Sequence, residues 1–315
     1  ETVALVGESG SGKSVTAMSL MRLIENAGGE IVEGKIALRG RSNNVVDIHS
    51  QTPSAMQDIR GADVSMIFQE PMTSLNPSYT IGNQLEEAMR RHSDVTREVA
   101  RDRAVFLLEK VVISGARSRL PQYPHQLSGG LRQRVMIAMT LMCGPDLIIA
   151  DEPTTALDIT IQAQILELMQ WLGKEYGTAN LIITHNLGVV ARYADRVNVM
   201  YAGKIIERGS AQEIYKNPRH PYTVGLLNSV PRLDEPMKEK LIPIEGQPPD
   251  LIALPQGCAF RARCRFAIDK CATEIPELVQ VADGHTAACF VSDKLGASVI
   301  AVSYTHLTLP TSDLV

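Results

Sequence analysis

The chain has 315 residues, with 31 lysines and arginines against 35 aspartates and glutamates, so its formal net charge is −4. This length accommodates a full α/β core with an appended domain. The charge argues against nucleic-acid binding by bulk positive charge. No uninterrupted apolar stretch approaches the roughly 20 residues of a membrane span, and no signal peptide precedes the first motif. We therefore expect a cytosolic chain, truncated at its start, that reaches a membrane only through another protein.

Four short apolar runs each lead directly into polar residues. The runs are residues 3–6, 64–68, 147–150 and 181–184, and they precede Gly7, Gln69, Asp151 and His185. Continuous apolar runs of this length are typical of strands covered on both faces in a parallel α/β sheet. Such sheets bind ligands at the carboxyl ends of their strands, where these polar residues are expected to gather.

Residues 7–14 match the phosphate-binding pattern G-x-x-x-x-G-K-S. Its glycines let backbone amides turn toward phosphates, and the helix that follows adds the positive end of its dipole. In this pattern the lysine supplies a point charge and the serine hydroxyl ligates Mg²⁺. The alternative is a chance glycine-rich turn, which the apolar strand before it and the helix after it disfavour. The candidate nucleotide-binding residues are Gly7, Ser9, Gly10, Gly12, Lys13 and Ser14.

Two adjacent acids follow the third apolar run. Asp151 is suited to holding Mg²⁺ through water, and Glu152 is suited to polarising an attacking water as general base. By themselves, adjacent acids at a strand end are as consistent with a solvated turn. Downstream of a phosphate loop they indicate a hydrolytic site.

Residues 127–135 predict a second anion site. Ser128 is a favourable N-cap, and Gly129 and Gly130 expose backbone amides at the start of a helix. Because no strand precedes this segment, it is not expected to share a pocket with Lys13 of the same chain. We expect it to serve a nucleotide held by another subunit. An ordinary capped helix is the alternative.

The remaining elements follow from periodicity and composition. Residues 81–112 are helical by period and form an insertion between the second and third runs. Residues 160–171 predict another amphipathic helix, and residues 196–201 and 204–208 predict a hairpin. Residues 34–40 read as a short strand. Proline density rises after Gly209, which indicates irregular structure and a domain edge.

Four of the five cysteines lie late in the chain with the spacing C-x₅-C-x₆-C-x₁₇-C. In a cytosolic protein such a cluster favours a metal site over disulfides, and four thiolates hold either zinc or an iron–sulfur cluster. Buried or free thiols remain the alternative. The cysteines are Cys258, Cys264, Cys271 and Cys289, and the isolated Cys143 is expected in the core.

The order of these motifs resembles the ATP-binding cassette (ABC) ATPases. The resemblance implies a dimer in which ATP lies between the phosphate loop of one subunit and the 127–135 signature of the other. It implies that Gln69 senses Mg²⁺ and the transport partner, that His185 contacts the γ-phosphate and the attacking water, and that Asp158 belongs to an inter-subunit loop. An apolar residue at Leu131, where many members carry glutamine, is familiar in one branch.

That branch is the dipeptide and oligopeptide importer ATPases, which residues 200–209, residues 220–227 and the late cysteines resemble. The resemblance implies ATP and Mg²⁺ as cofactors, with Ser14, Gln69 and Asp151 at the magnesium ion. It also implies a [4Fe–4S] cluster on the four cysteines, with Arg261, Arg263 and Arg265 offsetting its charge. Locally, residues 220–222 read as a turn that opens a helix.

The implied fold is an α/β P-loop NTPase core with a mostly parallel sheet, an antiparallel β subdomain, an inserted helical subdomain and a small irregular C-terminal extension. The expected divisions are an ATPase domain over residues 1–210, with helices over about 76–135, and an extension over 211–292. Residues 293–315 form a tail that we expect to be disordered, or foreign to the natural protein from about Val302.

The implied function is ATP hydrolysis that powers uptake of dipeptides and oligopeptides. The implied partners are a second ABC ATPase in a heterodimer, two permeases and an extracytoplasmic solute-binding protein, at the cytoplasmic face of the plasma membrane. Nickel or another small solute is an alternative cargo. A soluble ABC protein acting on nucleic acid is disfavoured by the single cassette and the absence of a basic stripe. A non-hydrolytic metal-sensing module is disfavoured by Glu152 and His185.

Overall fold

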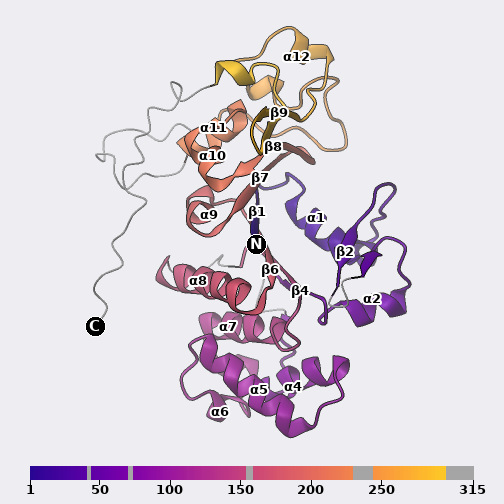
Figure 1. Cartoon of the computed structure of the whole chain (residues 1–315), viewed down its shortest axis with the longest axis vertical. Coiled ribbons are helices and arrows are strands. Elements are labelled where there is room, and N and C mark those ends of the chain that lie inside the picture. Colours follow the sequence, from indigo (N-terminus) through magenta and orange to yellow (C-terminus); the bar gives the residue numbers. More distant parts are fainter. Residues whose placement is uncertain (41–43, 70–73, 154–158, 230–243, 296–315) are drawn as a thin grey trace. The chain divides into compact units, whose positions relative to one another are not determined.

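The computed structural model describes residues 1–40, 44–69, 74–153, 159–229 and 244–295, without the side chains of residues 159, 160 and 189. The chain separates into two compact units (Figure 1). Unit 1 comprises residues 1–6, 12–185 and 193–195. Unit 2 comprises residues 7–11, residues 186–192 and the chain from Arg196 onward.

Unit 1 is built on four parallel strands. Their order across the sheet is β4 (Val64–Ile67), β5 (Leu147–Asp151), β6 (Ala179–Thr184) and β1 (Thr2–Val6). Ile67 lies opposite Ala150, Asp151 opposite Ile183, and Val6 opposite Thr184. The four strands therefore end at one edge of the sheet, as the apolar runs predicted.

Burial explains why these strands read as continuous apolar runs. All four residues of β4 are buried, and so are the last four of β5 and the last three of β1 and β6. A strand covered on both faces has no solvent side on which to alternate polar residues. The expected α/β class with a mostly parallel sheet is confirmed.

The helical insertion differs from one continuous stretch over residues 81–112. It forms α4 (Ile81–His92) and α5 (Arg97–Lys110), followed by α6 (Ala116–Arg119) and α7 (Gly129–Thr140). Thr96 ends the gap between α4 and α5, because its side chain accepts a hydrogen bond from the Val99 amide and caps α5. Apolar periodicity continues through both helices, so periodicity alone did not locate this break.

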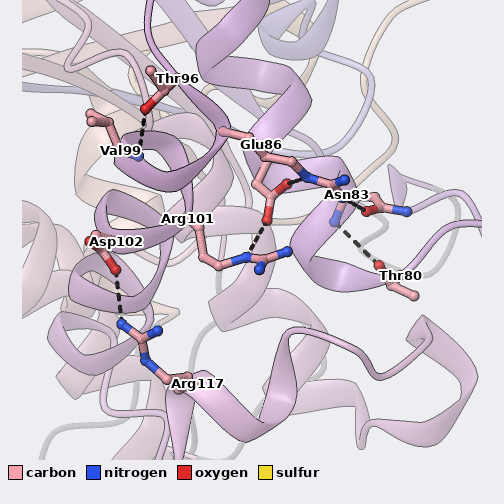
Figure 2. A network of polar contacts seen from close by, with 9 residues as sticks. Thr80, Asn83, Glu86, Thr96, Val99, Arg101, Asp102 and Arg117 are labelled. Atoms are coloured by element: carbon pink, nitrogen blue, oxygen red, sulfur yellow. Dashed lines mark hydrogen bonds and ion pairs between the residues drawn. The ribbon is translucent and has the colours of Figure 1, made fainter.

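A buried carboxylate ties α4 to α5. Glu86 is 3% exposed and accepts from Arg97 Nε at 2.6 Å and from Arg101 Nε at 2.8 Å (Figure 2). Burial raises the pKa of Glu86, but the hydrogen bonds and charges of the two arginines outweigh it and leave the pKa below its usual value. The pair of arginines thus keeps a buried charge ionised between the two helices.

The other elements of unit 1 complete its frame. Strands β2 and β3 form a separate antiparallel pair, so the short strand expected within residues 34–40 is present. Helix α8 extends beyond the expected 160–171. The bounds are α1 (Lys13–Leu20), η1 (Ile24–Ala27), β2 (Ala37–Arg39), β3 (Val45–Asp47), α2 (Pro53–Ile59), η2 (Pro124–Gln126) and α8 (Ile159–Tyr176).

Unit 2 contains an antiparallel sheet in the order β7 (Arg196–Tyr201), β8 (Lys204–Ser210), β10 (His285–Ala287) and β9 (Val279–Ala282). The hairpin β7–β8 matches the expected one. Strands β9 and β10 were not expected, because the extension read as irregular. The helices are α9 (Leu187–Tyr193), whose last residue belongs to unit 1, α10 (Ala211–Lys216), α11 (Pro221–Asn228), η3 (Arg261–Arg263), α12 (Lys270–Thr273) and η4 (Ser292–Lys294).

In the part of the chain that the structure describes, no helix combines the length and apolarity needed to cross a bilayer. The domain boundaries at residues 210 and 292 and the insertion limits of 76–135 stay predictions. The expected tail lies outside the described residues from residue 296 onward.

Candidate nucleotide site

The phosphate loop connects β1 to α1. Gly10 and Gly12 have φ angles of 79° and 102°, in the left-handed region that favours glycine. Helix α1 begins at Lys13, directly after Gly12. Lys13 is 5% exposed, and the hydroxyl of Thr16 donates to the Gly12 carbonyl at 3.0 Å. The motif therefore forms the expected strand, loop and helix start.

The first five residues of the loop, 7–11, belong to unit 2. A Cβ on Gly7 would lie 2.3 Å from the backbone oxygen of Met200 in β7, so only glycine fits there. The Gly203 amide, in the turn between β7 and β8, donates to the Ser11 carbonyl at 2.9 Å. Backbone contacts with the β7–β8 hairpin thus hold both ends of this part of the loop.

Asp151 lies at the end of β5 in unit 1 and is 5% exposed. Burial raises the pKa of its carboxyl; the hydrogen bond from Ser14 and the charge of Lys13 lower it, and the charge of Glu152 raises it, with a net upward shift. Its Oδ1 is buried and has no hydrogen-bond partner among the described residues. An orphaned carboxylate oxygen beside the Ser14 hydroxyl fits the hard-oxygen chemistry that Mg²⁺ requires.

The structure brings Glu152, Gln69 and His185 together. Glu152 Oε1 lies 2.9 Å from His185 Nδ1, and Gln69 Nε2 donates to Glu152 Oε2 at 3.2 Å. These three residues follow β5, β4 and β6, and all belong to unit 1. Their contact is the direct consequence of three parallel strands ending at the same edge.

This arrangement suits activation of water. The Glu152 side chain is 13% exposed and that of His185 is 56% exposed, so the carboxylate is held at the border of solvent. A carboxylate fixed by an amide on one side and an imidazole on the other is positioned to accept a proton from water. The neighbouring Asp151 and Lys13 supply the opposite charges that a phosphate–metal complex needs.

The 127–135 segment forms a capped helix start. Ser128 Oγ accepts from the Leu131 amide at 3.4 Å and caps α7, as expected. Ser128 and Gly129 are exposed, Gly130 is half-buried, and a Cβ on Gly129 would meet nothing within 4 Å. The helix end is thus open to solvent. Asp158, the remaining predicted residue, lies outside the described residues.

The four late cysteines surround one small cavity in unit 2, with Phe260 and Phe266 among its lining. Burial raises the thiol pKa of Cys258, Cys264 and Cys289, the last to about 12, and the charges of neighbouring cysteine thiols raise each of the three further. Backbone amides of Phe260, Phe266 and Val291 hydrogen-bond these sulfurs and lower the pKa.

Among the described histidine, cysteine and acidic side chains, no group of three or more is arranged to hold a metal ion. The four cysteines thus gather at one cavity, as expected. The described residues do not, however, show an arrangement that could hold a metal ion. The isolated Cys143 is half-buried and its Sγ contacts the Ala88 carbonyl at 3.3 Å.

One set of contacts around the phosphate loop was missed in the sequence. Glu8 pairs with Arg263, and its amide donates to the hydroxyl of Tyr222 at 2.7 Å. These partners lie more than 200 positions apart in the chain. The only available signal was that these residues occur in segments that resemble one family. That signal did not indicate which residues contact one another.

Comparisons with known proteins agree on one relationship. Residues 1–155 match the family described as ABC transporter, and residues 206–271 match the C-terminal region of oligopeptide/dipeptide transporters. A protein of Brucella melitensis named as a peptide import ATP-binding protein is 55% identical over 302 residues, covering 94% of this chain and 89% of that protein. The oligopeptide transport ATP-binding protein AppD of Bacillus subtilis is 51% identical over 297 residues, with the same coverage.

Solved structures show the same fold. The ATP-binding cassette MJ0796, in a dimeric post-hydrolysis state bound to ADP and Pi, is similar with a TM-score of 0.58 and 28% identity, over 67% of this chain and 85% of that one. CbiO1 from Clostridium perfringens, part of an ABC transporter complex, is similar with a TM-score of 0.54 and 25% identity, over 68% of this chain and 79% of that one.

A phosphate loop and strand-end acids on one edge of a parallel sheet define the class of P-loop nucleoside triphosphatases. Within that class the match to both family regions is specific. The chain belongs to the ABC transporter ATP-binding proteins with the oligopeptide/dipeptide-type C-terminal region. It is accordingly an ABC ATPase, for which ATP and Mg²⁺ are the expected cofactors.

Proposed function

We propose that this chain is the ATP-hydrolysing subunit of an importer for dipeptides and oligopeptides. The observation that carries the hydrolytic role is the Glu152 carboxylate, which is fixed between Gln69 and His185. Relatives named for peptide import and oligopeptide transport, at 51–55% identity along nearly the whole chain, support the cargo class.

Each residue of the site has a role in this proposal. The amides of residues 7–14 and the Lys13 ammonium bind the phosphates. Ser14, Asp151 and Gln69 hold Mg²⁺, which neutralises phosphate charge when bound. Glu152 takes a proton from the attacking water, and His185 contacts the γ-phosphate and helps orient that water.

The exposed start of α7 supports a dimer. Ser128, Gly129 and Gly130 present a capped helix end to solvent, and Asp158 would face the same interface. We propose that a second ABC ATPase subunit, as a heterodimer, supplies its own phosphate loop to this helix end. The dimeric state of the similar cassette MJ0796 supports this arrangement.

The proposed importer also contains two permeases and an extracytoplasmic solute-binding protein, with this chain at the cytoplasmic face of the membrane. The test is reconstitution with the permeases and solute-binding protein of the proposed importer, in proteoliposomes with internal Mg-ATP. We expect external dipeptides or oligopeptides to raise ATP hydrolysis several-fold and to accumulate inside. Stimulation by nickel and not by peptides would contradict the peptide assignment.

We also propose a [4Fe–4S] cluster on Cys258, Cys264, Cys271 and Cys289. The support is that four thiols line one cavity and that backbone amides hydrogen-bond the sulfurs of Cys258, Cys264 and Cys289. Arg265 places a positive charge beside Cys264. A cluster would bind these residues together and stabilise the extension.

Metal analysis of anaerobically purified protein tests this second proposal. We expect about four irons and four acid-labile sulfides per chain, lost in Cys271→Ser and retained in Cys143→Ser. The melting temperature should also fall when the metal is removed. One equivalent of zinc per chain would contradict this proposal, and so would protein that contains neither iron nor zinc.

A further inference from the structure

Glu8 is the one acidic residue within the phosphate loop, and its carboxylate pairs with Arg263. Arg263 Nη1 lies 2.7 Å from Glu8 Oε2, and Nη2 lies 2.9 Å from Oε1. This is a bidentate pair, the strongest geometry for a guanidinium and a carboxylate. The Arg263 side chain is 4% exposed and that of Glu8 is 29% exposed, so the guanidinium is buried and the carboxylate is partly open to solvent.

The guanidinium is fixed by other groups of unit 2. Its Nε donates to the Glu245 carbonyl at 3.0 Å, and Nη2 also donates to the Ile244 carbonyl at 3.3 Å. It lies over the rings of Tyr201 and Phe260, 5.9 Å from each centroid. Arg263 therefore reaches Glu8 from a preformed position, and little side-chain freedom is lost in making the pair.

The backbone of Arg263 is equally well held. It ends η3, between Cys258 and Cys264, and its amide donates to the Phe260 carbonyl at 3.0 Å. The Cys258 amide donates to the Cys271 carbonyl at 2.9 Å, which closes the cysteine-bearing segment on itself. The segment thus forms a compact platform that carries the guanidinium.

The loop backbone at Glu8 has a second support. The Glu8 amide donates to the Tyr222 hydroxyl at 2.7 Å, and Tyr222 is fully buried at the start of α11. The residue before α11, His220, is anchored because its amide and that of Arg219 donate to the buried carboxylate of Glu207. Residue 8 is therefore held through both its backbone and its side chain.

An unpaired carboxylate at this position would work against nucleotide binding. Glu8 lies within the loop whose amides surround a highly anionic triphosphate, so its negative charge repels that ligand. Pairing with Arg263 neutralises the charge and turns it to the side of the loop that meets the extension.

We infer that Arg263 is a positioning residue for ATP binding: from the cysteine-bearing extension it orients and neutralises Glu8 and thereby sets the affinity of the phosphate loop. The inference rests on the proposed ATPase function. It gives the C-terminal extension a direct part in nucleotide binding, carried by one ion pair.

Fluorescent-nucleotide titration of the full chain tests this inference. We expect Arg263→Met to raise the Kd for Mg-ATP about tenfold or more, as for loss of a charge-assisted bidentate pair. The Kd of Arg263→Lys should lie between that of Arg263→Met and that of the unmodified chain. Lysine keeps the positive charge and loses the bidentate geometry of the guanidinium. Arg261→Met, an exposed arginine two positions away, serves as the matched control and should bind as the unmodified chain does.

The decisive variant is Arg263→Met combined with Glu8→Gln. Removing the carboxylate should restore most of the affinity lost in Arg263→Met, because repulsion is then absent. A purely structural role of Arg263 predicts no such rescue. If Arg263→Met does not fold, Arg263→Lys takes its place. The Kd values for Mg-ATP of Glu8→Gln, of Arg263→Lys and of the double variant then measure the coupling between the two residues.

Four results separate the failure of this inference from the failure of the proposed function. Unchanged affinity in Arg263→Met, or no rescue by Glu8→Gln, overturns the inference and leaves the ATPase assignment intact. Absence of nucleotide binding by the unmodified chain would instead contradict the proposed function. An effect on kcat with an unchanged KM for ATP would also overturn the inference, since a loop-positioning residue acts on binding.

Discussion

Glu152 has a backbone φ of +48°, a conformation uncommon for residues other than glycine. Its amide donates to the Ile183 carbonyl at 2.9 Å, which holds the residue against β6 in this conformation. The side chain is then directed to Gln69 and His185. Such local strain persists only where the surroundings hold it, and it is common at functional sites.

The substitution Glu152→Gln tests the role of this residue. The amide is close in size and cannot accept a proton from water, so we expect kcat for ATP hydrolysis to fall about 10²–10⁴-fold with nucleotide affinity retained. Phosphate release under saturating Mg-ATP measures this. Glu175→Gln, an exposed acid on α8, should keep normal turnover. Turnover of Glu152→Gln within twofold of the unmodified chain would remove Glu152 as the base.

At the scale of elements, a buried histidine caps the start of α11. His220 is 2% exposed, and its Nδ1 accepts from the Tyr222 amide at 3.0 Å, so the ring is neutral with its proton on Nε2. Burial lowers the pKa of His220 to about 3. The sequence predicted a turn opening a helix here, and the structure shows that the histidine side chain caps it.

This cap makes stability depend on pH. The folded pKa lies below the unfolded value of about 6.5, so the unfolded chain takes up the proton first as pH falls. The group's contribution is fully present above pH 6.5 and is lost progressively below it, by about 2 kcal/mol between pH 8 and pH 5. His220→Asn retains a capping oxygen and does not titrate.

We therefore expect the free energy of unfolding of His220→Asn to fall less between pH 8 and pH 5 than that of the unmodified chain. Urea denaturation at the two pH values measures the difference. The exposed His125→Asn is the control and should keep the full pH dependence. Identical pH dependence in His220→Asn and the unmodified chain would contradict the account of this cap.

Burial explains which elements could be predicted from the sequence. The four parallel strands were predictable because each is an apolar run largely buried on both faces. The roles of Gln69, Glu152 and His185 stay predictions, and those of Gln69 and His185 came from the resemblance to one family. Strands β9 and β10 were not, because β9 is half exposed and β10 has only three residues. The break before α5 was missed because a single Thr96 cap decides it.

The pairing of Glu8 with Arg263 was beyond sequence reasoning for a different reason. Charged residues in loops have no periodicity, and the partners are separated by 255 positions. Their contact depends on how the cysteine-bearing segment folds against Glu245, Tyr201 and Phe260. That is a tertiary feature, which no local pattern encodes.

At the scale of the whole molecule, the proposed mechanism leaves the site chemically incomplete in one chain. In that proposal the phosphate loop, the acids and His185 bind and hydrolyse ATP, and the exposed start of α7 serves a nucleotide held by another subunit. The account therefore depends on two subunits that meet around ATP, each completing the site of the other.

Light scattering on the Glu152→Gln chain, alone and mixed with the second ABC ATPase of the proposed heterodimer, tests this claim most directly. With Mg-ATP present we predict a particle of twice the monomer mass, which reverts to monomers without nucleotide or when Ser128 is replaced by arginine. A chain that binds Mg-ATP and yet stays monomeric both alone and with its sister subunit would contradict the account.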